Sequence, residues 1–184
     1  MTRSSFFLLS ALVLGAVPAC SDPIQSGIIE AQGKEIEGIP KGPLHRSGQP
    51  CVACHSKNGP ASNSIYTVAG TIFQGPSKLV GVNNAEVRMT DSLGTKHVTK
   101  TNCVGNFMVK PDEWDPKFPI LVAVAKGGTL RRMNSVIGRE ASCGSCHTPN
   151  LDRDPTSQLV QVFLFGTEEV GAGPVECEVD PRIR

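Results

Sequence analysis

Apolar and polar residues alternate with a period of two through much of the middle of the chain, which is the pattern of half-buried β-strands. Ala85, Val87 and Met89 alternate with polar neighbours up to a turn at 91–94. Residues 120–125 are a continuous apolar run, so we expect that strand to be buried on both faces. Further strands are predicted at 66–73, 95–101, 107–109, 129–136 and 158–165. About seven short strands separated by turns indicate an all-β fold, an antiparallel immunoglobulin-like sandwich.

Four short motifs in this region resemble the carboxypeptidase-regulatory-like family, whose domains are transthyretin-like β-sandwiches. That family has a G-x-V strand, an A-x-V strand, a D-x-x-G turn and a T-x-x-x-G-x-F turn. The corresponding segments here are 68–71, 84–87, 91–94 and 101–107. The resemblance implies a transthyretin-like fold and no chemistry, because these motifs carry no catalytic residues.

The first 19 residues have the pattern of an export signal. Arg3 supplies a positive charge, and residues 6–17 are apolar but too few to span a membrane comfortably. The run ends in small residues before Cys20, as in bacterial lipoprotein signals, so we expect Cys20 to carry lipid after cleavage. Ordinary signal-peptidase cleavage is the alternative, because Pro18 fits the lipoprotein pattern imperfectly. Either cleavage exports the protein.

Residues 20–44 are expected to be a flexible tether leading to a single folded domain over 45–184. Gly and Pro interrupt this segment too often for a long helix. In the whole chain, 18 basic residues balance 17 acidic ones, so nothing in the charge indicates a nucleic-acid partner.

A pentapeptide with the pattern C-x-x-C-H occurs twice, at 51–55 and 143–147. It is the attachment pattern of c-type haem, in which two thiols bond the porphyrin edge and the histidine binds iron. Random placement of 7 Cys and 4 His would give roughly 0.006 copies. Both motifs resemble those of c-type cytochromes, so we expect two covalently bound haems. The expected thioether residues are Cys51, Cys54, Cys143 and Cys146, and the expected proximal ligands are His55 and His147.

Three other uses of the cysteine pairs compete with haem. A C-x-x-C pair can be a redox dithiol, although no βαβ pattern surrounds either pair. Four thiolates can hold a structural zinc ion, but these pairs lie farther apart than in a zinc ribbon, and zinc would not require the histidines. Simple disulfides are the third use.

Distal iron ligands are sought among the remaining histidines and methionines. His45 is the better distal candidate, because it lies in a Pro- and Gly-rich loop just before the first motif, which is itself expected in irregular chain. His97 and Met133 compete for the second iron, and an exposed strand position is the alternative role for His97. Met89 alternates with core residues and is expected to pack inside.

Cys103 and Cys177 are left over once haem and lipid take the other five cysteines. Two spare cysteines in an exported protein usually pair, so they are candidates for a disulfide. Haem propionates would also need neutralising charge, although solvent-exposed strand faces explain the basic residues at least as well. The basic candidates are Lys110, Lys126, Arg131 and Arg132.

These features together predict a β-sandwich with haem-bearing loops that carries single electrons between redox partner proteins. An exported, lipid-anchored chain would work in the bacterial cell envelope, in the periplasm, at the outer membrane or at the cell surface. One alternative is a peroxidase-like dihaem enzyme with one open iron position. The other is a β-sandwich scaffold or binding lipoprotein whose cysteine pairs hold zinc or form disulfides.

Overall fold

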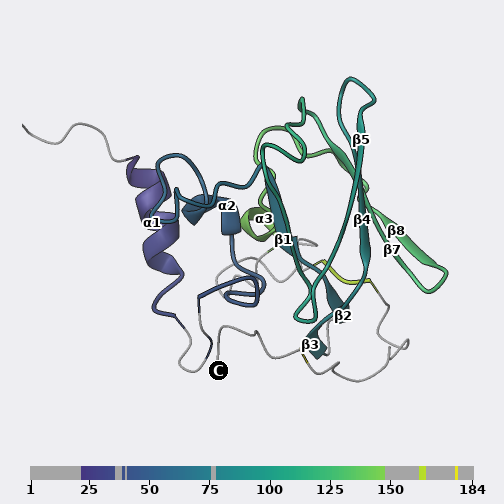
Figure 1. The fold of residues 1–184 in the computed structure, drawn as a ribbon, viewed down its shortest axis with the longest axis horizontal. Helices are drawn as coiled ribbons and strands as arrows, with labels where there is room; N and C mark the ends of the chain where they lie inside the picture. The colour runs from purple at the N-terminus through teal and green to yellow at the C-terminus, as the bar shows by residue number, and fades with distance from the viewer. Residues whose placement is uncertain are drawn as a thin grey trace, which may run out of the picture.

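The fold is seen in a computed structural model, which describes residues 22–35, 39, 41–75, 78–147, 162–164 and 177. Strands make up most of its regular structure, and the named strands pair only in antiparallel fashion (Figure 1). The expected all-β fold class is therefore confirmed. No helix in the described ranges is long and apolar enough to cross a membrane. The expected signal segment 1–19 and Cys20 lie outside the described residues.

The largest sheet contains four antiparallel strands in the order β5-β4-β7-β8. The strands are β4 (Glu86–Thr90), β5 (Lys96–Lys100), β7 (Leu121–Lys126) and β8 (Thr129–Arg132). On β4, Val87 and Met89 are buried while Arg88 between them is exposed, as the alternating pattern predicted. Gly127 and Gly128 both have positive φ and form the turn between β7 and β8.

Two further strand pairs lie outside the four-stranded sheet, and the β1–β6 pair is the one on which both C-x-x-C-H motifs pack. β1 (Val68–Thr71) pairs with β6 (Asn106–Val109), and β2 (Phe73–Gly75) pairs with β3 (Lys78–Gly81). β1 is buried along its whole length, and Ser142 forms a parallel bridge with Ala69.

The described part of the strand predicted at 158–165 is residues 162–164. Phe163 forms a parallel bridge with Phe73, and the Leu164 side chain is fully buried. The remainder of that predicted strand lies outside the described residues.

One cluster of buried apolar side chains joins the β1–β6 pair to the four-stranded sheet. Burying one such side chain stabilises a fold by about 1.5–3 kcal/mol. Met89 belongs to this cluster, which confirms its predicted place in the core. The largest fully buried members are Phe107, Ile72, Met89, Ile120 and Leu164.

Strand β7 is not buried on both faces, so that prediction is wrong. Val124 is its one buried residue, and Leu121 is 56 % exposed. An antiparallel sheet can leave one face to solvent, and Leu121 pairs with Thr90 of β4 on that outer face.

A helix, α1 (Pro23–Ala31), replaces the first part of the tether expected over 20–44. The Asp22 side chain accepts the backbone N–H of Ile24 at 2.9 Å and caps the helix, and Pro23 provides a favourable first residue. This start signal is local, and the high Gly and Pro content of the segment obscured it.

Candidate functional site

Both C-x-x-C-H motifs fold into a single helical turn of the same shape. In α2 (Cys51–Cys54) and α3 (Cys143–Cys146), the N–H of the following histidine donates to the first cysteine's carbonyl, at 2.9 and 2.8 Å respectively. Positions i, i+3 and i+4 of a helical turn share one face, so each motif's two sulfurs and its imidazole start from the same side. The first motif was expected in irregular chain, and this turn corrects that expectation.

The two motifs are distant in sequence but lie against each other in the structure, where α2 and α3 are neighbours (Figure 1). The Ser142 hydroxyl, at the start of α3, accepts the N–H of Val52 in α2 at 3.4 Å. Gly144 of α3 lies directly against the backbone of Gln49 and Pro50. Both helices also pack on β1. The fold therefore assembles the two predicted attachment sites into one region.

A cleft beside α2 brings His45 next to His55. Their ring centroids lie 5.8 Å apart with an angle of 27° between the planes. Tyr66 stacks on His55 at 4.4 Å and lines the same cleft, as does Met108. The cleft has a volume of about 470 Å³, part of it open to solvent. The distal candidate chosen from the sequence thus shares a cleft with the first proximal candidate.

Backbone groups orient both imidazoles through their Nδ1 atoms. His55 Nδ1 lies 2.7 Å from the carbonyl oxygen of Ser64, and His45 Nδ1 contacts the carbonyl oxygen of Gly42. A proton on Nδ1 of His55, donated to Ser64, leaves the Nε2 lone pair of that ring for a metal. At His45, Nδ1 also accepts the Gly42 N–H at 3.1 Å. Metal-binding histidines are commonly held in this way.

The environment also favours a neutral ring at His55. Burial lowers the pKa of His55, nearby positive charge on His45 lowers it further, and the hydrogen bond with Ser64 partly opposes the shift. A neutral imidazole retains the lone pair that an iron ligand must supply.

The two rings have a separation that an iron atom could bridge. Two metal–nitrogen bonds of about 2 Å, plus half of each ring, place imidazole centroids roughly 6 Å apart. The observed 5.8 Å between His45 and His55 agrees with that requirement. The separation of the two ring centroids is therefore compatible with two imidazole ligands to one iron.

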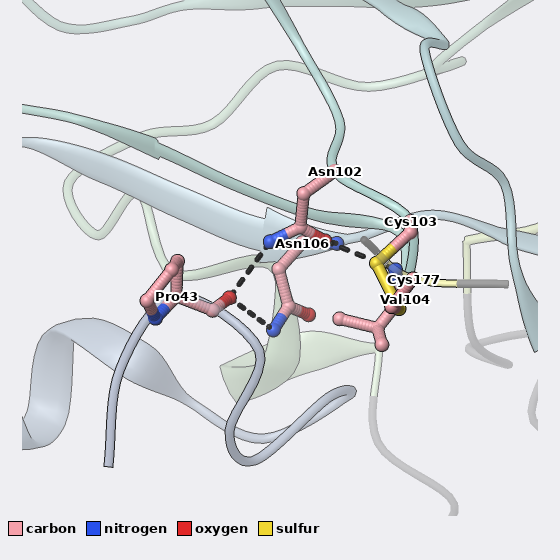
Figure 2. Close-up of a disulfide and its surroundings, with 6 residues drawn as sticks. All are labelled: Pro43, Asn102, Cys103, Val104, Asn106 and Cys177. Carbon is pink, nitrogen blue, oxygen red and sulfur yellow. Dashed lines mark hydrogen bonds between the residues drawn. A yellow bond between two sulfur atoms is a disulfide. The ribbon is translucent and has the colours of Figure 1, made fainter. Parts of the chain in front are cut away.

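Asn106 holds the loop that carries His45. Its Nδ2 donates to the carbonyls of Pro43 at 3.2 Å and His45 at 3.0 Å, and its Oδ1 accepts the Thr71 hydroxyl at 2.7 Å. Figure 2 shows Asn106 reaching Pro43 from β6. Because Asn106 is buried, these bonds fix the position of the loop against β1 and β6.

The disulfide lies in the turn that supports the same loop (Figure 2). Cys103 and Cys177 are bonded, with their Cα atoms 5.2 Å apart. The neighbouring Asn102 donates from Nδ2 to the Pro43 carbonyl at 2.7 Å. The two spare cysteines thus brace the turn against which the His45 loop rests.

Helix α1 and Arg46 hold the other side of the first motif. Gln25 of α1 donates from Nε2 to the Ala53 carbonyl and to the Ser56 hydroxyl, both at 2.7 Å. The guanidinium of Arg46, next to His45, forms an ion pair with Glu35 at 3.0 Å and lowers the pKa of that carboxyl. The motif is therefore enclosed by a segment that sequence reasoning treated as a tether.

Burial keeps two motif thiols protonated when no haem is attached. It raises the pKa of Cys51 to about 11 and that of Cys143 to about 12. Charge on Cys51 contributes to the shift at Cys143, so these two sulfurs are neighbours. Zinc requires thiolates, and no three Cys, His, Asp or Glu side chains converge as metal ligands within the described residues.

The candidates for the second iron lie on or beside the four-stranded sheet. His97 of β5 stacks on Trp114 with centroids 5.4 Å apart and an angle of 9°. Met133 follows β8, and its N–H donates to the Val122 carbonyl at 3.0 Å. Neither side chain lines the cleft of His45 and His55. Stacking on Trp114 is enough to explain the position of the His97 ring without a bound metal.

Two of the proposed propionate-neutralising residues have backbone partners. Lys126 donates to the Asn83 carbonyl at 2.5 Å, and Arg131 donates to the Leu164 carbonyl at 2.9 Å. Lys110 and Arg132 are exposed. Arg46, the neighbour of His45 in sequence, also lines the cleft. Asn106 was missed because only long-range contacts bring it to the site.

Comparison with protein-family models, curated proteins and solved structures finds no significant match for this chain.

Proposed function

We propose that this chain is a c-type dihaem cytochrome that carries single electrons. The observation that carries the proposal is the pairing of His45 with His55 beside the first attachment turn, at 5.8 Å between ring centroids. Backbone groups hold Nδ1 of both rings, Ser64 at His55 and Gly42 at His45. Packing of an apolar core does not require two paired histidines in a cleft.

The residues of the first site have distinct roles in this proposal. Cys51 and Cys54 would form the thioethers, and His55 and His45 would bind the iron. Tyr66 stacks on His55 and shields that ring from solvent. Bound haem supplies the one-electron chemistry of iron, which the axial ligands and the surrounding burial tune.

The second site uses Cys143 and Cys146 for attachment and His147 as the proximal ligand. His97 and Met133 remain the candidates opposite His147. If His45 and His55 both bound the iron of the first site, no position there would be open to a substrate, as expected of an electron carrier. Peroxide turnover by the purified protein would instead favour the peroxidase-like alternative.

Covalent haem content tests the proposal directly. The whole chain is produced in a host that attaches c-type haem, and its mass and visible spectrum are measured after denaturation. We expect two haems per chain, both resistant to acid-acetone extraction, because thioether bonds do not depend on the fold. A C51A/C54A double variant should retain one haem. A denatured wild-type chain without haem absorbance would overturn the proposal.

The site of action is proposed to be the bacterial cell envelope, with lipid on Cys20 and redox partner proteins as donor and acceptor. The proposal rests on the apolar run at 6–17 and the small residues before Cys20. Cys20→Ala should move the protein from the membrane fraction to the soluble fraction with both haems in place. Equal membrane binding by this variant would contradict lipid anchoring.

A further inference from the structure

The outer face of the four-stranded sheet is the face turned away from the buried core. Side chains of paired residues, and of alternate residues along a strand, lie on the same face of a sheet. The register of β5, β4, β7 and β8 therefore places the outer side chains in three rows that cross the strands. The first row contains Val98, Arg88, Ala123 and Arg132, the second Lys100, Glu86, Ala125 and Leu130, and the third Lys96, Thr90 and Leu121.

Each of these rows presents an aliphatic side chain to solvent. Val98 of β5 is 55 % exposed, Leu130 of β8 is 45 % exposed, and Leu121 of β7 is exposed to a similar extent. They come from three different strands, so the apolar surface extends across the sheet. Removing apolar surface from water is favourable, and such surface bordered by charge is typical of a contact with another surface.

The same face is basic, although the chain as a whole is close to neutral. Glu86 is the one carboxylate in the three rows, and it forms an ion pair with Arg88 at 2.6 Å. Four cations against one carboxylate give these rows a net charge of +3, while the whole chain has a formal net charge of +1. The cations, all exposed, are Arg88, Lys96, Lys100 and Arg132. A partner that covers this face should therefore be negatively charged.

An anionic lipid surface fits the face better than an acidic protein does. Protein interfaces are typically enriched in aromatic residues and depleted in lysine. The three rows of these described strands contain no aromatic residue, and two of their four cations are lysines. A bilayer surface requires no fixed pairing of groups. Its summed headgroup charge attracts lysine and arginine alike, and aliphatic side chains can enter the boundary between headgroups and acyl chains.

We propose that the outer face of the four-stranded sheet binds an anionic phospholipid surface through Lys96, Lys100 and Arg132, with Leu121 and Leu130 entering the headgroup boundary. The β1–β6 pair lies across the core from this sheet and carries α2 and α3 on its far side (Figure 1). A membrane on the outer face therefore leaves the cleft beside α2 turned toward the aqueous phase. The contact involves neither haem nor the lipid proposed on Cys20.

Sedimentation with lipid vesicles tests the contact in the exported Cys20→Ala chain, which carries no acyl chain at that position. The vesicles are equal mixtures of phosphatidylglycerol and phosphatidylcholine, or phosphatidylcholine alone. We expect binding to the mixed vesicles at low salt and little binding to phosphatidylcholine. Binding should weaken as salt rises, because ions screen exposed charges. No binding to the mixed vesicles would overturn the proposal, favour an acidic protein as the partner, and leave the cytochrome proposal intact.

Charge variants in the same chain test which surface makes the contact. K96Q/K100Q/R132Q should lower the affinity for mixed vesicles about 100-fold, because each cation near an anionic surface contributes roughly a factor of five. K34Q/K57Q/K110Q is the matched control, because it removes the same charge from exposed positions outside the sheet and should lower the affinity far less. Equal weakening by the two triple variants would overturn the assignment to this face. L121Q/L130Q keeps the charge and should lower the affinity several-fold, and unchanged affinity would overturn the role of the two leucines.

Discussion

The imidazole rings of His45 and His55 lie 5.8 Å apart in one cleft, with Nδ1 of each ring engaged by a backbone carbonyl. The loop that carries His45 precedes the first attachment turn and is held from β6 by Asn106. The pairing therefore depends on tertiary contacts around the motif as well as on the motif itself.

Replacing His45 should change the spin state of one haem. His45→Ala is expected to convert that iron from low spin to high spin, with both haems still covalently attached, because one axial position opens. His45→Met should preserve six-coordination and raise the potential of that haem, since a thioether favours ferrous iron. Absorption and paramagnetic resonance spectra measure both effects. Two low-spin haems in the alanine variant would show that His45 is not an iron ligand.

Replacing His97 should distinguish packing from ligation at the second site. The stack of His97 on Trp114 predicts that His97→Ala lowers the free energy of unfolding by about 0.5–1.5 kcal/mol, without changing the spin state of either haem. Denaturant unfolding and visible spectra measure the two effects. A new high-spin signal in this variant would instead identify His97 as the second distal ligand.

Asn106→Ala should loosen the loop that carries His45. The carbonyls of Pro43 and His45 would each lose a hydrogen bond from Asn106, and the buried Thr71 hydroxyl would lose its acceptor, at a cost of about 1–3 kcal/mol. We expect a lower denaturation midpoint and a partial high-spin signal from one haem. Asn134→Ala, at an exposed position, is the control and should change neither. An unchanged spin state in Asn106→Ala would show that the Asn106 side chain does not position His45 as a ligand.

The motif thiols should differ in reactivity when the chain is made without haem. Burial raises the pKa of Cys51 to about 11 and that of Cys143 to about 12. At pH 8 both thiols are therefore protonated and should alkylate slowly with iodoacetamide, while the exposed Cys146 reacts first. Labelling at Cys51 and Cys143 should accelerate as the pH rises toward 11. Mass spectrometry of peptides measures the order, and uniform labelling at pH 8 would contradict the buried arrangement.

Removing the cap of α1 should destabilise that helix locally. Asp22→Ala deletes the side chain that accepts the Ile24 N–H, a loss of about 1 kcal/mol. Hydrogen exchange should accelerate at α1 amides and stay unchanged in β4 and β7. Fast exchange at α1 in the wild-type chain would indicate instead that the segment behaves as the tether first expected.

Local sequence determined the features that depend on neighbouring residues. The alternation around Val87 and Met89 predicted the buried face of β4, because side chains of a strand point to opposite faces in turn. The spacing of each C-x-x-C-H motif specified its attachment chemistry, because both cysteines and the histidine lie within one helical turn. Asp22 and Pro23 also signalled a helix start, although the glycines and prolines that follow outweighed that signal.

Only the tertiary structure decided what lies opposite each element. Leu121 belongs to an apolar run, but its exposure depends on whether anything covers the outer face of the sheet. The contact of Gly144 with Pro50 and the bond from Asn106 to the His45 loop join segments distant in sequence. Such contacts form when separate elements pack around a common core, and no local pattern records which partners that packing brings together.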